Sequence, residues 1–102
     1  MKKPIPALDL DRLVHEPARL AILAHLHVVD EADFTWLSQN IGLTKGNLSS
    51  HMSKLEDAGY LRIHKDFEDG KPVTTLKISA AGRRALKRYR TDLEQVLGHL
   101  PR

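Results

Sequence analysis

The chain has 102 residues, enough for one small domain, and its 41% hydrophobic and 28% charged residues are typical of a folded globular protein. It contains no cysteine, which excludes disulfides, thiolate metal sites and cysteine nucleophiles. The formal net charge is +3, and residues 71–102 hold eight basic and only two acidic residues. This surplus favours a polyanionic partner.

The first half of the chain predicts three helices. Residues 1–8, with two prolines, are expected to form an extended arm, and a short amphipathic turn follows. Pro17 suits the first turn of a helix, and apolar residues at helical spacing carry this helix to about Val29. Thr35 is the expected N-cap of a helix over 36–41, and Gly42 is the expected stop.

A helix-turn-helix is predicted over residues 35–59 because a second helix follows the glycine turn at once. Thr44 is its expected N-cap, and Gly59 its stop. Its apolar stripe consists of Leu48, Met52, Leu55 and Ala58.

In the second half of the chain the pattern of apolar residues changes from helical to strand-like. Residues 60–78 are rich in β-branched side chains around Asp69-Gly70, which predicts a β-hairpin. Ser79 is the expected cap of a long last helix over 79–100, with an apolar stripe from Leu86 to Leu100.

This order of elements describes an α+β, mainly α, winged helix-turn-helix. Residues 11–23, residues 43–61 and the segment Ser79–Arg83 resemble ArsR-like and MarR-like bacterial or archaeal transcriptional regulators. The resemblance covers roughly residues 10–90 and looks closest to a small single-domain subgroup. It implies one winged-helix DNA-binding domain over 1–102, with a two-stranded wing (60–78) and flanking N- and C-terminal dimerisation helices.

The helix after Thr44 is the expected recognition helix. A DNA major groove about 12 Å wide accepts one helix, which needs a buried apolar face and an outward face of short polar or basic residues. Positions 45, 46, 47, 49 and 50 match those that contact DNA in ArsR-like proteins. The expected DNA-binding residues are Thr44, Lys45, Gly46, Asn47, Ser49, Ser50, Lys54, Lys65 and Lys71.

Two of these assignments have structural alternatives. Asn47 lies three residues after Thr44 and could serve only the helix start. Lys65 and Lys71 flank a wing tip that carries Asp66, Glu68 and Asp69 where the resembling families usually carry a basic residue. A solvated hairpin is therefore an alternative to phosphate contact, and the acids favour a second hypothesis, a winged helix used as a protein-interaction module.

The last helix is expected to reach beyond so small a domain and to meet its copy in a homodimer. A twofold dimer would hold two recognition helices about 34 Å apart on a pseudo-palindromic operator. An ordinary intramolecular helix is the alternative. The expected dimer-interface residues are Ile5, Leu8, Leu10, Leu93, Val96, Leu97 and Leu100.

Other side chains are assigned structural roles. Arg19 could reach a phosphate, but a pair with Glu56 or Asp57 is favoured. His51 lies next to the apolar stripe and is expected to be a packed, hydrogen-bonded histidine. Residues Trp36 and Tyr89 are expected in the core rather than in a ligand pocket.

The sequence has no phosphate loop, zinc-protease motif or nucleophile motif, so no enzyme and no cofactor are expected. Six histidines keep a metal sensor as an alternative, with His15 and His99 able to meet near the dimer helices. His25 and His27 lie on different helix faces and cannot chelate one ion alone. We expect no metal, and the sequence leaves a small effector ligand undetermined.

The apolar run Leu20–Ala24 is too short to span a bilayer, so no membrane partner and a cytoplasmic location are expected. The leading hypothesis is a homodimeric, sequence-specific regulator of transcription that binds double-stranded DNA, usually a repressor in the resembling families.

Overall fold

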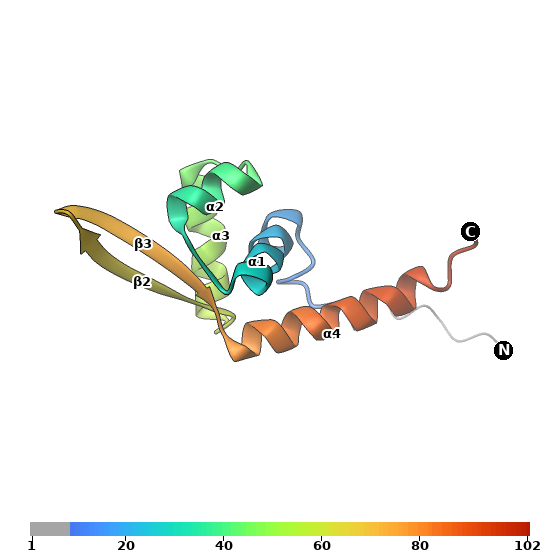
Figure 1. The fold of residues 1–102 in the computed structure, drawn as a ribbon. Helices are drawn as coiled ribbons and strands as arrows, with labels where there is room; N and C mark the ends of the chain where they lie inside the picture. Colours follow the sequence, from blue (N-terminus) through green and yellow to red (C-terminus); the bar gives the residue numbers. More distant parts are fainter. Residues whose placement is uncertain (1–8) are drawn as a thin grey trace.

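The structure, a computed structural model, describes residues 9–102 as four helices and one three-stranded antiparallel sheet (Figure 1). The sheet has the strand order β1-β3-β2. The described elements, in chain order, are α1 (Pro17–Val29), β1 (Glu31–Asp33), α2 (Phe34–Ile41), α3 (Lys45–Asp57), β2 (Leu61–Glu68), β3 (Lys71–Ile78) and α4 (Ala80–Leu97). The mainly helical α+β fold class is confirmed. No helix in residues 9–102 combines the length and hydropathy needed to cross a membrane.

Helix α1 begins and ends as predicted. Pro17 occupies its first turn, and the carboxylate of Glu16 caps it by accepting a hydrogen bond from the backbone N–H of Arg19 at 2.8 Å. Asp30 ends the helix with a φ of 74°, which turns the chain into β1. Residues 9–16 before α1 form turns, so an N-terminal dimerisation helix is not found in the described chain.

The predicted start of α2 is wrong. The helix begins at Phe34 rather than after Thr35, and the cap is Asp33, whose carboxylate accepts from the backbone N–H of Trp36 at 3.0 Å. The reason is β1, a short strand that the sequence analysis missed. β1 pairs with β3, with Asp33 opposite Thr75, and this pairing delivers Asp33 to the start of the helix. Gly42 ends α2 with a φ of 81°, as predicted.

Helix α3 and the hairpin follow the predicted ranges. Thr44 caps α3 by accepting from the backbone N–H of Asn47 at 3.1 Å. The helix ends before Gly59, although Ala58 is exposed rather than part of the buried stripe. Asp69 and Gly70 both have positive φ, 52° and 77°, as the two-residue turn of a tight hairpin requires.

Helix α4 crosses the base of the molecule and projects beyond it, opposite to the hairpin (Figure 1). Ser79 caps it by accepting from the backbone N–H of Gly82 at 2.9 Å. The helix ends at Leu97, three residues earlier than predicted, so Leu100 lies beyond the helix rather than in it.

The core lies where α1, α2, α3 and the inner face of the sheet meet. Tyr89 of α4 is buried in it, as predicted, whereas Trp36 is 41% exposed and is not a core residue. Leu10, expected at a dimer interface, is instead buried in the core of this chain, and Ile5 and Leu8 lie outside the described residues. The fully buried side chains include Val14, Ile22, Leu23, Leu26, Leu37, Leu48, Leu55, Leu61 and Leu76.

Candidate nucleic-acid interface

Helix α3 separates buried and exposed side chains cleanly. Leu48 and Leu55 are fully buried and Met52 is nearly so, which fixes the rotation of the helix against the core. The cap at Thr44 leaves the first turn at the surface, where backbone N–H groups favour an anion. The predicted DNA-binding residues of this segment are all exposed: Thr44, Lys45, Gly46, Asn47, Ser49, Ser50 and Lys54.

The exposed face of α3 is short and polar. Gly46 has open space where a Cβ would stand, so a DNA backbone or base edge can approach the helix closely there. The backbone N–H of Asn47 serves the cap, but its side chain is exposed and keeps its paired amide donor and acceptor. A helix surface of this kind can both bind phosphate and read base edges.

A polar cluster from α1 supports the middle of α3. Arg19 donates from Nε to the carbonyl oxygen of Leu13 at 2.6 Å, and its Nη1 lies 3.3 Å from Nδ1 of His51. The same His51 nitrogen lies 3.7 Å from the carboxylate of Glu16. His51 is therefore a packed, hydrogen-bonded histidine as predicted, whereas the predicted pair of Arg19 with Glu56 or Asp57 is wrong.

The Glu16 carboxylate is tuned by this cluster. Burial acts to raise its pKa, but hydrogen bonds from the backbone N–H groups of Arg19 and Ala18, with the electrostatic influence of His51 and Arg19, outweigh burial and lower the pKa from its usual 4.5. The ionised form of Glu16 is thus the one that the fold prefers.

A second link ties the end of α3 to the turn before α1. The Tyr60 hydroxyl donates to Asp11 at 2.8 Å, while the other Asp11 oxygen accepts from the backbone N–H groups of Leu13 and Val14. Burial, followed by the bond to the Asp11 carboxylate, raises the pKa of Tyr60. Sequence reasoning missed this pair because the two residues are 49 positions apart.

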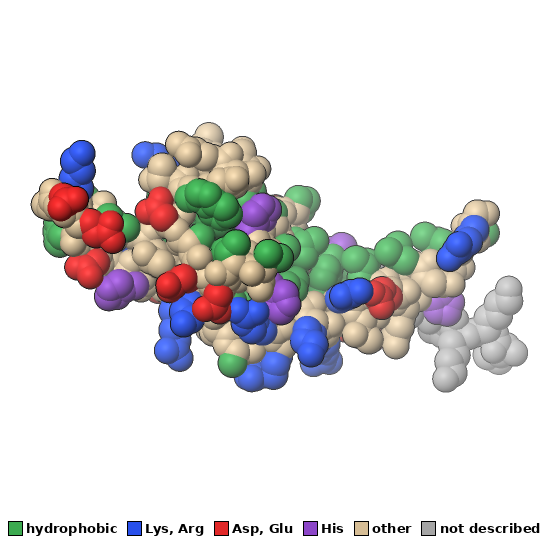
Figure 2. Space-filling model, in the orientation of Figure 1, with side chains coloured by type: hydrophobic (Ala, Val, Ile, Leu, Met, Phe, Trp, Pro, Cys, Tyr) green, Lys and Arg blue, Asp and Glu red, His purple; other side chains and the backbone are tan. Residues whose placement is uncertain are grey.

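The hairpin carries two of the predicted lysines, one on each of its faces. Lys65 and Lys71 are both exposed, and Lys71 lies opposite Glu68 in the strand register. Figure 2 shows acidic side chains gathered at the hairpin end of the molecule. The pKa of Asp66 is lowered, first by a hydrogen bond from the backbone N–H of Phe67 and then by His64.

Basic side chains line the outer side of α4, along the lower edge in Figure 2. Two arginines of α4 are paired within the helix: Arg88 with Asp92 at 3.8 Å and Arg90 with Glu94 at 2.9 Å. Arg83 binds Asp30 at 2.5 Å and anchors the start of α4 to the end of α1. Lys77 also lies 3.7 Å from Asp30. These pairs reduce the charge that α4 offers to a distant polyanion.

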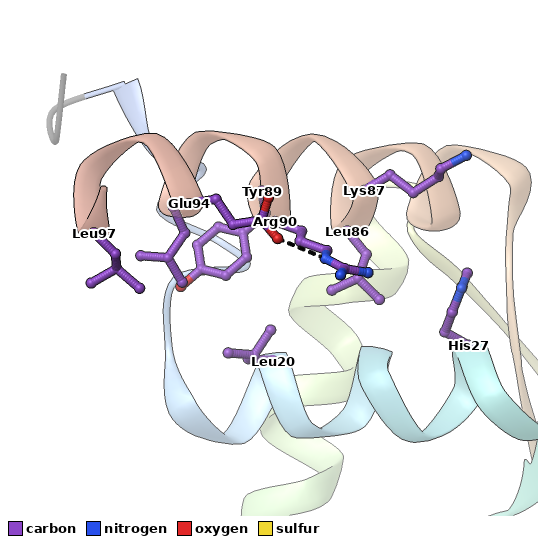
Figure 3. A pocket seen from close by; sticks show the side chains of 9 residues that line it. Leu20, His27, Leu86, Lys87, Tyr89, Arg90, Glu94 and Leu97 are labelled. Atoms are coloured by element: carbon purple, nitrogen blue, oxygen red, sulfur yellow. Dashed lines mark hydrogen bonds and ion pairs between the residues drawn. The ribbon is translucent and has the colours of Figure 1, made fainter. Parts of the chain in front are cut away.

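A cavity of about 410 Å³ lies between α1 and α4. In Figure 3 the side chains of Leu20 and His27 rise from α1 toward α4, which carries Leu86, Leu97 and the Arg90–Glu94 pair. His15 is hydrogen-bonded to the hydroxyl of buried Tyr89 at 2.7 Å. Within residues 9–102, no group of three or more histidine, aspartate or glutamate side chains is arranged to hold a metal ion.

Comparison with known proteins places these features in a family. Residues 18–97 match a model described as a winged helix DNA-binding domain. An uncharacterised protein of Methanocaldococcus jannaschii is 33% identical over 85 residues, which cover 83% of this chain and 92% of that protein.

Solved structures agree with that family. A transcriptional regulator homologue from Pyrococcus horikoshii OT3 is 31% identical and superimposes with a TM-score of 0.81, over 86% of this chain and 87% of its own. A MarR-family regulator from Silicibacter pomeroyi shares the fold, with a TM-score of 0.62 and 19% identity over 87% of this chain and 62% of its own. The resemblance to ArsR-like and MarR-like regulators is confirmed, as is the expectation that the chain is not an enzyme. The chain belongs to the winged helix DNA-binding domain family, and its function is DNA binding in the regulation of transcription.

Proposed function

We propose that the protein is a homodimeric, sequence-specific repressor that places α3 in the major groove of its operator. The observation that carries this proposal is the division of α3, in which the residues from Lys45 to Ser50, apart from buried Leu48, are exposed, short, polar or basic. In this arrangement Lys45 and Asn47 meet base edges, and Ser49 and Ser50 meet phosphates. Lys54 and Lys65 add phosphate contacts, whereas Lys71, predicted as a third, lies beside Glu68 on the other face of the hairpin.

The dimer is supported by the far end of α4. Leu97 is 53% and Leu100 57% exposed, while Leu93 and Val96 pack only partly against the core. Isolated exposed leucines are common, but Leu97 ends an apolar stripe along a helix that has left the body of the molecule, and Leu100 follows just past the helix end. Pairing of two such helices would place two recognition helices on successive turns of DNA. A repressor would act from there by occupying a promoter.

The first experiment selects bound fragments from random duplex DNA and measures affinity for the selected sequence. Ser50→Glu places a carboxylate against the phosphates and should lower affinity by about 100-fold or more, with an unchanged unfolding curve. Gln95→Glu adds the same charge on exposed α4 and serves as the matched control. Retained binding by Ser50→Glu would contradict the assignment of α3.

The salt dependence separates this function from a second candidate, a protein-interaction module, which the acidic residues of the hairpin end favour. A protein that neutralises 6–10 phosphates loses about 10³–10⁵ in affinity between about 50 and 200 mM salt. We expect a steep decrease of this kind. A flat response would favour the protein partner, and a reporter gene downstream of the selected sequence would test repression.

A small effector is a further candidate because the cavity between α1 and α4 has a mainly apolar lining. Leu93→Trp should fill it. A ligand that shifts the melting temperature of the wild type but not of this variant would identify the cavity as an effector site; no shift across a panel of aromatic acids would count against such effectors.

A further inference from the structure

Phe67 is an aromatic side chain left in solvent at the far end of the hairpin. It is 72% exposed, although Phe is among the residues most often buried. The hairpin carries it well away from the core, to the end of the molecule opposite the tip of α4 (Figure 1). Nothing in the DNA-binding assignment above uses this side chain.

The strand register shows which side chains share its face. Ile63 packs against the core, and side chains alternate along a strand, so Lys65 and Phe67 continue the core-facing side of β2 toward the tip. Their cross-strand partners are Thr74 and Pro72, which lie on the same face. This face of the projecting hairpin therefore carries one cation, one aromatic ring and no carboxylate.

The strand acids lie on the opposite face. His64, Asp66 and Glu68 alternate with Lys65 and Phe67, and Asp66 is paired in register with Val73. Asp66 is also held locally, because it accepts from the backbone N–H of Phe67 at 2.7 Å and lies 3.6 Å from His64. Only Asp69, in the turn itself, belongs to neither strand face. The hairpin end is thus two-sided rather than uniformly acidic.

The side that carries Phe67 is also the side of the recognition helix. Ile63 belongs to the same core as Leu48 and Leu55 of α3, and α3 packs directly against β2. A duplex that follows the exposed face of α3 toward the hairpin would meet Lys65 and Phe67, with Asp66 and Glu68 turned away from its phosphates.

We propose that Phe67 is a DNA-contacting residue that enters the minor groove as an apolar wedge, beside a phosphate contact by Lys65. Apolar side chains inserted at a base step partly unstack it and bend the duplex, and pyrimidine–purine steps yield most easily. The wing of this protein then selects a deformable step rather than reading base edges through a basic tip. This inference rests on the proposed binding of a duplex along α3.

The test uses the duplex selected by the wild-type protein, with 2-aminopurine placed in turn at each base step flanking the α3 contacts. Wild-type binding should raise the 2-aminopurine fluorescence at one pyrimidine–purine step. Phe67→Ala should abolish that rise and lower the affinity about tenfold, whereas Phe67→Leu, which keeps an apolar wedge, should retain most of both. Phe67 is exposed, so the circular dichroism of the variants should match the wild type.

Val73→Ala is the matched control, because it truncates an apolar side chain on the opposite face of the same hairpin. Equal losses of affinity in Phe67→Ala and Val73→Ala would assign the effect to hairpin stability and overturn the proposal. Unchanged affinity and fluorescence in Phe67→Ala would also overturn it and leave Phe67 to a protein partner. Ser50→Glu on the same duplex keeps the two assignments apart: binding that survives this substitution but is weakened by Phe67→Ala would refute the role of α3 and support the wedge.

Discussion

Glu16 performs two tasks at once, since one carboxylate caps α1 and also faces His51 on the recognition helix. Arg19, one turn later, completes the arrangement by bonding both the preceding turn and His51. The position of α3 relative to α1 therefore depends on polar contacts as well as on the leucine core. A substitution of Glu16 should therefore lower the stability of the fold, by an amount that depends on pH.

The predicted pH dependence follows from the direction of the Glu16 shift. A carboxylate whose pKa is lowered by folding stabilises the native state above its usual pKa of 4.5, and this contribution disappears as the pH falls through the lower, folded-state pKa. Glu16→Gln should therefore cost about 1 kcal/mol at pH 7, as expected for a weakened N-cap. The difference from wild type should shrink below about pH 4.5.

Urea unfolding at pH 7 and at several values below 4.5 measures this difference. Glu56→Gln removes a carboxylate from the exposed surface of α3 and is the control, which should follow the wild-type curve. A Glu16→Gln deficit that stays constant across the whole pH range would show that the capping geometry alone, and not its charge, stabilises α1.

At the scale of elements, the sequence predicted the helix caps and turns that depend on contacts between residues close along the chain. Thr44, Gly42, Ser79 and the Asp69-Gly70 turn were all identified because each acts through neighbours only a few residues away. Strand β1 was missed because three residues carry no period, and it exists only through pairing with β3. The start of α2 was misplaced for the same reason.

The same distinction between local and long-range contacts applies to the candidate site. Exposure of the outward residues of α3 followed from its apolar period, because the buried stripe fixes the opposite face. The partners of Arg19 could not be inferred, since they depend on how α1 crosses α3. The two faces of the hairpin needed the strand register, which places Asp66 opposite Val73 and Phe67 opposite Pro72.

At the junction between the end of α3 and the start of α4, one added methyl group should strongly lower the stability of the fold. Gly82 is buried, and a Cβ there would stand 2.0 Å from the carbonyl oxygen of Tyr60, a backbone atom that also accepts from the N–H of Ser79 at 3.1 Å. Gly82→Ala should therefore destabilise the fold by about 3 kcal/mol or more, despite the better helix propensity of alanine.

Gly46→Ala provides the comparison, because a Cβ at Gly46 has no neighbour within 4 Å. It should leave stability unchanged or raise it by up to about 1 kcal/mol. Thermal unfolding of both variants measures the contrast. Equal stabilities would mean that the close approach of α4 to Tyr60 is not maintained in solution.

At the scale of the whole molecule, two arms leave the core in opposite directions. The hairpin carries Lys65 and Phe67 on the side of α3, and exposed leucines lie at and just past the end of α4. One arm suits the contact with DNA, and the other suits the contact with a second chain. Separation of these two surfaces allows each to be disrupted without the other.

The dimer proposal can therefore be tested by a change that leaves α3 and the hairpin intact. Leu97→Glu combined with Leu100→Glu places two carboxylates at the end of α4 and just beyond it, where both leucines are more than half exposed in the single chain. The fold of the monomer should persist, because neither side chain belongs to the buried core. Sedimentation should show a dimer for the wild type and a monomer for the double variant.

The effect of the double variant on DNA affinity should depend on whether the duplex carries one half-site or two. A duplex with two half-sites about 34 Å apart engages both recognition helices of a dimer, so the double variant should bind it about 100-fold more weakly. Binding to a duplex with one half-site should be unchanged, which excludes damage to α3. Gln95→Glu with Gln39→Glu adds the same charge at exposed positions outside the stripe and should remain dimeric. A double leucine variant that still sediments as a dimer would mean that the two chains associate through another surface, and the projecting end of α4 would then be an ordinary solvated helix.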